Sequence, residues 1–524
     1  MILQSGMNKT FAYLFAIVIL FSACRKEPTT WNSSLVVPIA HGSLTLDEII
    51  PDSLLELDEA NVWHLVLEEN LTDINADSLA ALPDTTITQA FEVPFSSGTL
   101  TLQPGITIFS TNEETTLGIS GAELKYAEMK SGFLHYKVKS YVNGYLTSLY
   151  QLPGVMLGPS NVAITANTPP KVGNSPGISE GTIDLSNYSI DLTGESGSSS
   201  NSIYSTLTVS VTSTAPSAAI VQGQDSIVIE LSFVDATVNY ARGYFGQQFY
   251  EINEQVDFGG DVNMPTGSML LEQARMDLSI TNYIGVDGKL NITGISAGNE
   301  FTTNALDYSP IYNVLNITRA LDNQGVIYPF STSYLINEGN SNLTSFIGDL
   351  PNYLELTGNL EINPLGNISG YNDFIYADKP LEAKVHLDIP LKLATSGLTM
   401  SDTIRVTTGE DGYANGNLIL MLDNYFPFSA NVLLQFADGE EEIILENGYL
   451  PAAQLTEPGS SIAQSTQVNI PVSNSDLERL KSGDRVFIRV TFTTPDYPTT
   501  YSLYKDYRID YKLLIDANVE FSFE

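Results

Sequence analysis

The stretch Leu207-Thr208-Val209-Ser210-Val211-Thr212 alternates apolar and polar side chains at every position. The same alternation recurs over Lys384 to Ile389 and again over Val519 to Phe523. Neighbouring side chains of a strand point to opposite sides of a sheet, so this pattern predicts strands with one buried and one wet face. Clusters of Gly, Asn, Asp, Ser and Pro separate the alternating runs at short intervals, which is typical of antiparallel sheets.

Helical signals are few. A capping box at Ser475 to Glu478, followed by Gly483, predicts a short helix. Two further short helices are expected over Asn342 to Leu350 and over Ile311 to Asn323. None of them recurs between strands as parallel βαβ units require. We therefore predict an all-β chain of several β-sandwich-like domains in tandem with a few short helices.

The chain has 524 residues, a length that suggests several domains. Tyr141, Tyr283 and Tyr425 each follow an alternating run and precede a second one, and they stand 142 residues apart in both intervals. Regular spacing is what duplicated domains produce. The expected units are a leader over 1–23, a β-rich segment over 24–100, and β-sandwich-like domains over 101–240, 241–380 (with the short helices) and 381–524.

The single cysteine, Cys24, closes a short leader. Lys9 supplies a positive charge, Phe11 to Phe21 supplies an apolar run too short to span a bilayer, and Ser22 and Ala23 are small. The sequence Leu20-Phe21-Ser22-Ala23-Cys24 resembles the lipobox of bacterial lipoproteins. That resemblance implies cleavage before Cys24 and a lipid on its thiol, with the body tethered to a membrane through the lipid anchor.

Further resemblances concern the place of the protein. Arg25 follows Cys24, so the aspartate that retains many lipoproteins in the inner membrane is missing, and Lys26-Glu27 resembles the export tag of surface lipoproteins. With this leader, Val37 to Leu46 and Leu350 to Pro364 resemble uncharacterised cell-envelope lipoproteins of the Bacteroidota. These likenesses imply a cell-envelope location, an outer membrane lipoprotein on the periplasmic or surface face. Asp423 to Phe428 resembles the β-sandwich domains of late-embryogenesis-abundant type 2 proteins.

The charge is strongly acidic. The formal net charge is −38, and removal of Lys9 with the leader leaves 22 basic against 61 acidic residues, or about −39. Such a chain repels phosphates and anionic membrane surfaces, so no nucleic acid partner is expected. With one cysteine there is no disulfide framework, and the core must hold by packing.

No motif predicts catalysis. Gly177-Ile178-Ser179-Glu180-Gly181 and Gly294 to Gly298 match Gly-x-Ser-x-Gly, but neither enters a helix as the nucleophile elbow requires, so both are expected to be turns. The four histidines lack zinc-site spacing and are expected to be solvated or partly packed; they are His41, His64, His135 and His386. Carboxylates at 438–442 and 410–415 offer oxygen ligands for calcium, although neither cluster has the alternating register that wraps one ion. No cofactor is expected.

Asp-Ser and Asp-Thr pairs followed by an apolar residue, or close to that pattern, resemble the O-glycosylation acceptor of the Bacteroidota. The acceptors would be Ser53, Ser78, Thr85, Ser226 and Thr403. Coincidence in a chain rich in Ser, Thr and Asp is the alternative.

The function expected from the sequence is therefore that of a non-catalytic cell-envelope lipoprotein, acting as a binding or scaffold module for an envelope protein or a glycan. Two alternatives stay open. One is a carrier of a glycan or apolar ligand, which requires a deep cavity. The other is a carbohydrate-active hydrolase, which requires two convergent carboxylates in a cleft.

Overall fold

The computed structural model describes residues 29–47, 50–74, 84–94, 97–119, 121–257, 267–323, 325–406, 413–436, 443–473, 475–476, 479–480 and 485–523. The described part consists of antiparallel strands with a few short helices, which confirms the predicted all-β fold. The opening stretch behaves as its pattern predicts, because Leu207, Val209 and Val211 are buried while Thr208 and Ser210 face outward.

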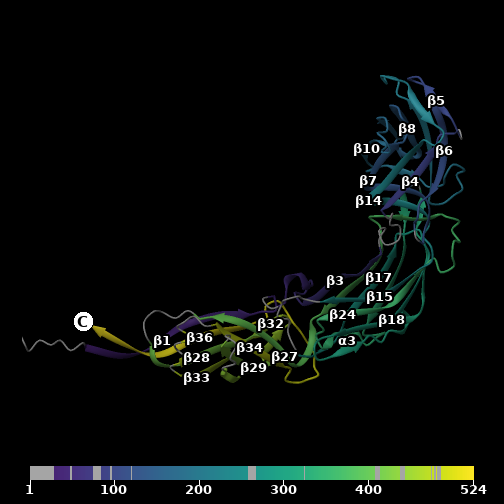
Figure 1. Ribbon diagram of the computed structural model, residues 1–524. Helices are drawn as coiled ribbons and strands as arrows, with labels where there is room; N and C mark the ends of the chain where they lie inside the picture. The colour runs from purple at the N-terminus through teal and green to yellow at the C-terminus, as the bar shows by residue number, and fades with distance from the viewer. Residues whose placement is uncertain are drawn as a thin grey trace, which may run out of the picture.

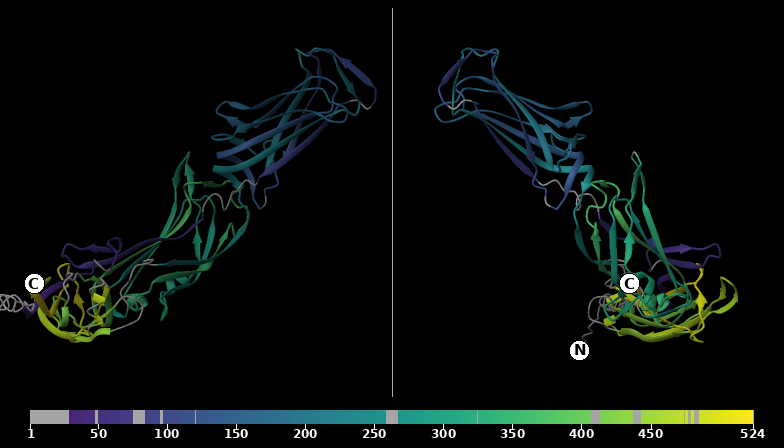
Figure 2. Two further views of the ribbon diagram at one scale, coloured as in Figure 1. Left: turned by 60° about the vertical axis from the view of Figure 1, so that its left-hand side comes forward. Right: turned by 90° about the vertical axis from the view of Figure 1, so that its right-hand side faces the viewer.

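The strands form three modules that follow one another in a curved row (Figures 1 and 2). We call them the distal, middle and terminal modules. The terminal module holds both ends of the described chain, and the distal module is the farthest from them. In the terminal module the first strand pairs with the last, from Thr29 opposite Phe523 to Leu44 opposite Ile509. The distal module lies at the other end of the row.

The distal module contains β4 (Thr85–Glu92), β5 (Thr99–Leu102), β6 (Thr107–Thr116), β7 (Glu123–Ser140), β8 (Leu146–Leu157), β9 (Ser160–Thr168), β10 (Gly177–Asp184), β11 (Ser189–Asp191), β12 (Ser202–Val211), β13 (Ala219–Gln222) and β14 (Ser226–Tyr244).

The middle module contains η1 (Asp52–Leu54), β2 (Leu55–Leu57), β3 (Trp63–Ile74), β15 (Gln248–Asp257), β17 (Arg275–Asn282), β18 (Gly288–Gly298), β19 (Thr303–Ala305), η2 (Ser309–Tyr312), β20 (Leu315–Ile317), β21 (Leu321–Asn323), β22 (Val326–Tyr328), β23 (Phe330–Asn337), α3 (Leu343–Gly348), β24 (Tyr353–Ile362), β25 (Asp373–Tyr376) and β26 (Leu381–Pro390).

The terminal module contains β1 (Thr29–Leu44), β16 (Met269–Leu271), β27 (Lys392–Arg405), β28 (Tyr413–Asn424), β29 (Ser429–Phe436), β30 (Ile443–Leu450), β31 (Gln454–Glu457), β32 (Ser460–Ile462), β33 (Gln464–Pro471), β34 (Arg485–Thr493), β35 (Tyr501–Ser502) and β36 (Ile509–Phe523).

The three modules share one strand arrangement. Each module has a row of four paired strands. A strand from the N-terminal part of the chain pairs with the module's last strand. The last strand pairs with the strand that ends directly before Tyr141, Tyr283 or Tyr425, and this strand pairs with a fourth. The orders are β4-β14-β7-β10, β3-β26-β17-β23 and β1-β36-β28-β33. The facing strand groups correspond in the same way, with orders β6-β12-β8-β9, β15-β24-β18 with β19 and β20, and β27-β34-β29-β30. In the distal module β11 pairs with both β7 and β8 and joins the two groups into one continuous sheet.

The modules are nested rather than sequential. The distal module lies in the chain between β3 and β15 of the middle module, and both lie between β1 and β27 of the terminal module. The strand pairing therefore does not follow the boundary expected near residue 100, since β1, β3 and β4 each complete a different module. Strand β26 was expected to begin the last domain, over 381–524. The strand pairing places it in the middle module, between β3 and β17.

Of the three helices expected from the sequence, one is confirmed, one is wrong and one is described only in part. The helix expected over Asn342 to Leu350 is confirmed as α3. The helix expected over Ile311 to Asn323 is wrong, because Pro310 starts only the single turn η2 and the short strands β20 and β21 follow it. For the helix expected from Ser475, residues 475–476 and 479–480 are helical and its other residues lie outside the described part.

Candidate functional site

The residue that would carry the lipid, Cys24, lies outside the described residues, as does the acceptor Ser78. The described chain begins five residues after Cys24, at Thr29 in β1. Because β1 is antiparallel to β36 over its whole length, Thr29 lies at the free end of the terminal module. A lipid on Cys24 would therefore be joined to the end of the row that lies opposite the distal module.

The remaining acceptors differ in exposure. Ser53 is exposed in the single turn η1, where a modifying enzyme can approach it. Thr85, Ser226 and Thr403 are half-buried on strands β4, β14 and β27. Thr85 also lines an apolar pocket of the distal module.

The two Gly-x-Ser-x-Gly sequences lie within strands. Ser179 is in β10 and Ser296 is in β18, so the expectation of turns is wrong. The cause is pairing, because β10 joins the edge of β7 and β18 lies beside β24. Ser296 Oγ donates to Glu355 Oε2 at 3.2 Å, across the paired strand.

The histidines are exposed or half-buried on strands, and two of them, His64 and His135, bind neighbouring side chains. His64 Nδ1 lies 2.6 Å from Asp388 Oδ1, and its Nε2 lies 3.8 Å from Asp58 Oδ2. His135 Nδ1 lies 2.7 Å from Thr182 Oγ1. His41 and His386 are exposed and half-buried on β1 and β26.

Most of the carboxylates proposed as calcium ligands lie outside the residues that the structure describes. Residues 438–442 and 410–412 are not described, and of 413–415 only the backbone is described. Among side chains that are described, no group of three or more His, Cys, Asp or Glu has the geometry to hold a metal ion.

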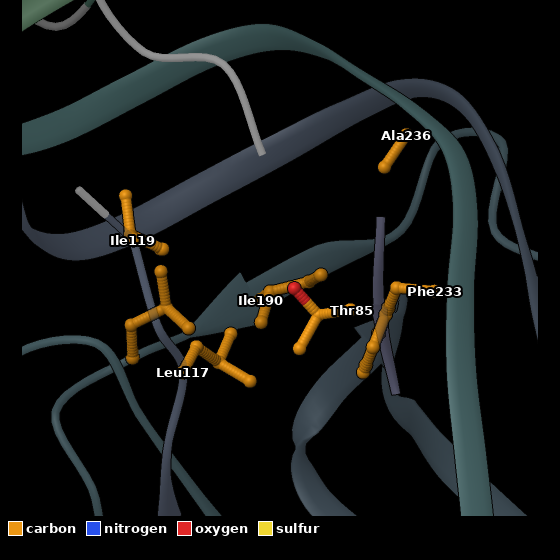
Figure 3. A pocket seen from close by; sticks show the side chains of 7 residues that line it. Thr85, Leu117, Ile119, Ile190, Phe233 and Ala236 are labelled. Carbon is orange, nitrogen blue, oxygen red and sulfur yellow. The ribbon is translucent and has the colours of Figure 1, made fainter. Parts of the chain in front are cut away.

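Two pockets are lined almost wholly by apolar side chains. One lies in the distal module between Leu117, Ile119, Ile190, Phe233 and Ala236 (Figure 3) and has a volume of about 20 Å³, room for a single water. The other has a volume of about 60 Å³ and lies between the middle module, which supplies Leu65, Ile347 and Leu387, and Met269 of β16 in the terminal module. Sites for small organic ligands have volumes of roughly 300–1,000 Å³, so neither pocket has the size that a carrier requires.

A polar depression of about 420 Å³ lies on the outer face of β4-β14-β7-β10 in the distal module. Lys137 Nζ lies 2.9 Å from Glu180 Oε2, and Lys139 forms an ion pair with Glu230. The hydrogen bond to Glu180 and its negative charge raise the pKa of Lys137. Both carboxylates are thus bound to lysines, and the acid and base pair of a hydrolase would need them released.

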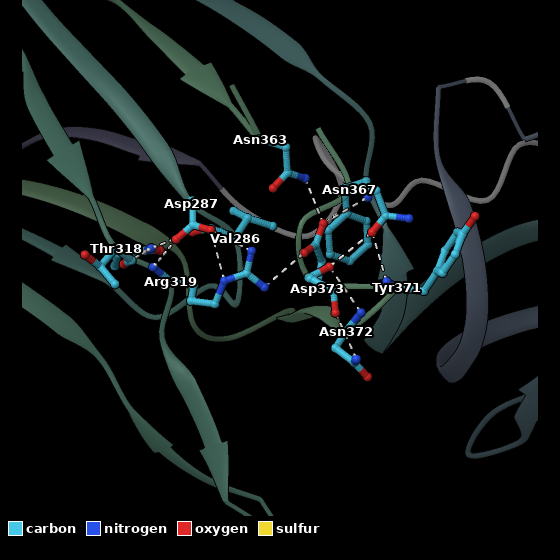
Figure 4. A network of polar contacts seen from close by, with 12 residues as sticks. Val286, Asp287, Thr318, Arg319, Asn363, Asn367, Tyr371, Asn372 and Asp373 are labelled. Carbon is cyan, nitrogen blue, oxygen red and sulfur yellow. Dashed lines mark hydrogen bonds and ion pairs between the residues drawn. The ribbon is translucent and has the colours of Figure 1, made fainter. Parts of the chain in front are cut away.

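A buried polar network joins the distal and middle modules (Figure 4). Strand β14 continues beyond its own module to pair with β25, which begins at the buried Asp373. Arg319 bridges two carboxylates, with Nη2 at 2.7 Å from Asp287 Oδ2 and Nη1 at 3.2 Å from Asp373 Oδ1. Asn363 Nδ2 donates to Asp373 Oδ2 at 2.7 Å, and the amide of Phe245, just after β14, donates to the same oxygen at 3.4 Å. Arg319, Asp287, Asn363 and Asp373 all belong to the middle module, so the network holds β25 in that module, and β25 is joined to the distal module by its pairing with β14 and by the hydrogen bond from Phe245.

Sequence reasoning missed Arg319, Asp287 and Asp373, because they are separated in sequence and nothing in their local patterns marks them. It also missed the buried asparagines that precede Tyr283 and Tyr425. The signal for these was available, since the spacing of 142 residues that applies to the tyrosines applies to Asn282 and Asn424 as well.

Comparison with known proteins adds little. No family model matches the chain, and no curated protein matches it. Among solved structures, the chain is similar to a "putative secreted protein" from Parabacteroides distasonis, with 12% identity over 92% of this chain and 99% of that one, at a TM-score of 0.27. A TM-score of that size does not demonstrate a shared fold. Within the described residues, no helix has the length and hydropathy needed to cross a membrane.

Proposed function

We propose that this protein is a non-catalytic binding lipoprotein of the cell envelope, tethered through Cys24, which holds its distal module away from the membrane. An outer membrane lipoprotein is the form we favour. The observation that carries the proposal is the position of Thr29 at the free end of the terminal module, opposite the distal module.

The segment that would join the lipid on Cys24 to the first strand is short. Four residues, 25–28, separate Cys24 from Thr29, and an extended chain spans at most about 3.5 Å per step, so the Cα of Cys24 would lie within about 17 Å of the first strand. A lipid-modified cysteine with two or three acyl chains gives stable anchoring. The row of modules then begins at the membrane surface.

Electrostatics supports a body that stands away from the membrane. The mature chain carries about −39, and anionic lipid headgroups repel such a chain at short range. The nested strand pairing and the network at Arg319 join the distal and middle modules through several connections rather than through one linker. These features support a rod that presents its outer module to a partner.

Replacing Cys24 tests the tether. We expect Cys24→Ala to move the protein from the envelope fraction to the soluble fraction, with its far-UV spectrum still that of a β protein. Ser22→Ala, which keeps a small residue beside the cleavage site, is the matched control and should stay in the envelope. Envelope retention of Cys24→Ala would contradict the proposal.

A further inference from the structure

The two outer faces of the distal module differ in charge. On β4-β14-β7-β10 the outward side chains include Glu92, Glu230, Lys137, Lys139 and Glu180. The outward face of β6-β12-β8-β9, which we call the neutral face, carries no charge at the following positions: Thr107, Ser110, Asn112, Thr147, Leu149, Gln151, Ala163, Thr165, Asn167, Tyr204, Thr206, Thr208 and Ser210.

The absence of charge is a property of whole segments. The sequence ranges 93–112, 140–170, 172–179 and 196–224 contain no Asp, Glu, Lys or Arg, in a chain of which 16% is charged. These ranges supply β5, β8, β9, β12 and β13, and most of β6. Lys171 and Asp225, which border them, form an ion pair with each other at 2.7 Å. Acidic side chains lie at the border of the neutral face: Glu114 pairs opposite Tyr204, and Glu195 Oε1 accepts a hydrogen bond from Asn112 Nδ2 at 3.2 Å.

Hydrogen bonds between strands hold the side chains of the neutral face in place. Ser110 and Thr208 are 3.0 Å apart, Thr107 and Ser210 are 3.3 Å apart, and Thr147 donates to Asn167 at 2.8 Å. A hydroxyl has one donor and two acceptor positions, so a pair of hydroxyls that share one hydrogen bond keeps a donor and several acceptors for solvent or a ligand. The face is therefore an ordered array of neutral donors and acceptors.

Solubility alone does not explain this composition. Exposed sheet faces and edge strands usually carry charged side chains that prevent association with other sheets, as the opposite face of the same module does. The chain as a whole has a net charge of −38, so most of its surface is surrounded by counterions and strongly bound water. A neutral partner can contact the neutral face without displacing either.

We infer that the neutral face binds an uncharged polysaccharide. The inference rests on the proposed function, because it names the partner class that the presented module would take. Sugar hydroxyls donate and accept hydrogen bonds as the Thr, Ser, Asn and Gln side chains do. A protein partner fits less well, because interface cores are apolar and aromatic, whereas this face carries two apolar side chains, Leu149 and Ala163, and one aromatic ring, Tyr204.

The test is binding of the purified, detergent-solubilised mature protein to immobilised dextran, laminarin and mannan, with alginate as an anionic polysaccharide. We expect retention on at least one uncharged polysaccharide, none on alginate, and an affinity unchanged between about 0.05 and 0.5 M NaCl, because neutral contacts are not screened by salt. The double variant Gln151→Glu/Thr165→Glu adds two charges to the neutral face at outward positions and should weaken binding about tenfold or more, equivalent to the loss of one or two hydrogen bonds.

The matched control is Thr88→Glu/Gln467→Glu, which makes the same chemical changes at exposed positions on the opposite face of the distal module and on the terminal module. It should bind within about twofold of the unchanged protein. Absence of retention on all three uncharged polysaccharides, equal losses in the two double variants, or binding that falls with salt would each overturn the inference. So would a dimer of the unchanged protein that Gln151→Glu/Thr165→Glu converts to a monomer, since the face would then be occupied by a second copy.

The polysaccharide-binding test and the membrane-tether test can fail independently of each other. Polysaccharide binding is measured on purified protein and does not depend on Cys24, whereas the membrane fractionation of Cys24→Ala does not depend on the neutral face. An envelope-bound protein that retains no polysaccharide would keep the proposed tether and lose only the partner class.

Discussion

Asn282 and Asn424 lie 142 residues apart and make the same set of hydrogen bonds. The Oδ1 of each accepts the backbone N–H two residues on, of Ile284 and Phe426, at 2.9 Å in both cases. The Nδ2 of each donates to the carbonyl four residues on and to a carbonyl of a distant loop. Both side chains are buried at the corner where the chain leaves one sheet of its module for the other.

The tyrosines that follow these residues repeat as well. The backbone N–H groups of Tyr141, Tyr283 and Tyr425 donate to the carbonyls of Ser226, Pro380 and Arg508, each at the start of the module's last strand or directly before it. In the distal module Ser140 takes the place of the asparagine, and its Oγ accepts the N–H of Val142 at 3.3 Å. The three corners therefore share one construction.

The first prediction concerns this corner. Asn424→Ala leaves the buried carbonyl of Phe428, the half-buried carbonyl of Pro451 and the buried N–H of Phe426 without their partner, and each unsatisfied buried group costs about 1–3 kcal/mol. We expect the terminal module to lose about 2–4 kcal/mol of unfolding free energy, measured by chemical denaturation. Asn417→Ala, at an exposed position of the same strand, should change it by less than about 0.5 kcal/mol. Equal effects of the two substitutions would refute a structural role for the corner.

The second prediction concerns the junction of the distal and middle modules. Arg319→Ala leaves the buried Asp373 without its cation, which should destabilise the junction by about 3 kcal/mol. Arg319→Lys should restore little, because an ammonium cannot reproduce the planar fork that bridges Asp287 and Asp373. Small-angle scattering should then show a broader range of molecular dimensions.

The control for that experiment is Arg275→Ala. Arg275 pairs with Asp277 at 2.8 Å, but its side chain is 58% exposed, so the pair should contribute between zero and about 1 kcal/mol. If Arg275→Ala broadens the scattering profile as much as Arg319→Ala does, the junction is not held by this network.

The third prediction concerns alkaline pH. Burial raises the pKa of Tyr150 to about 12, while its phenol donates to Gln89 Oε1 at 2.7 Å in the core of the distal module. The folded state thus keeps a proton that the unfolded chain releases near pH 10. The stability is fully present below pH 10 and is lost as pH rises towards 12, by up to about 2.7 kcal/mol.

Denaturation of the protein at pH 8 and at pH 11 measures this effect. Tyr150→Phe should be less stable at pH 8, because Gln89 loses its hydrogen bond, and should show a smaller loss between the two pH values. Burial also raises the pKa of Tyr507 in the terminal module to about 12, so part of the alkaline loss should remain in the variant. An unchanged pH dependence in Tyr150→Phe would contradict the assignment.

The fourth prediction concerns glycosylation. Ser53 is exposed in a single turn, whereas Ser226 and Thr403 are half-buried within strands that pair with neighbouring strands. If the acceptor pattern is used after folding, we expect glycan on Ser53 and none on Ser226 or Thr403 in mass spectra of peptides from the native host. Ser53→Ala should remove that mass and Ser226→Ala should leave it. A glycan on Ser226 in the mature protein would show that modification precedes folding.

Much of the local structure could be predicted from the sequence. The alternation at Leu207 to Thr212 gave the strand and the side that it buries, and the spacing of Tyr141, Tyr283 and Tyr425 marked three equivalent corners. The short helix at α3 was found from its polar start and the Pro that ends it. The helix expected near Ile311 failed because its apolar residues are also compatible with short strands, and a short apolar segment does not distinguish the two.

The amino-acid sequence by itself determined the all-β character, the face that each clearly alternating strand buries and the charge-free segments, because these depend on the side chains of one stretch of chain at a time. Only the tertiary structure decided that β1, β3 and β4 complete three different modules, and that Arg319 meets Asp287 and Asp373. The physical reason is that backbone hydrogen bonds are the same for every pair of strands. An alternating segment therefore specifies which face it buries, and the choice of its neighbour is made by packing between residues that are hundreds of positions apart.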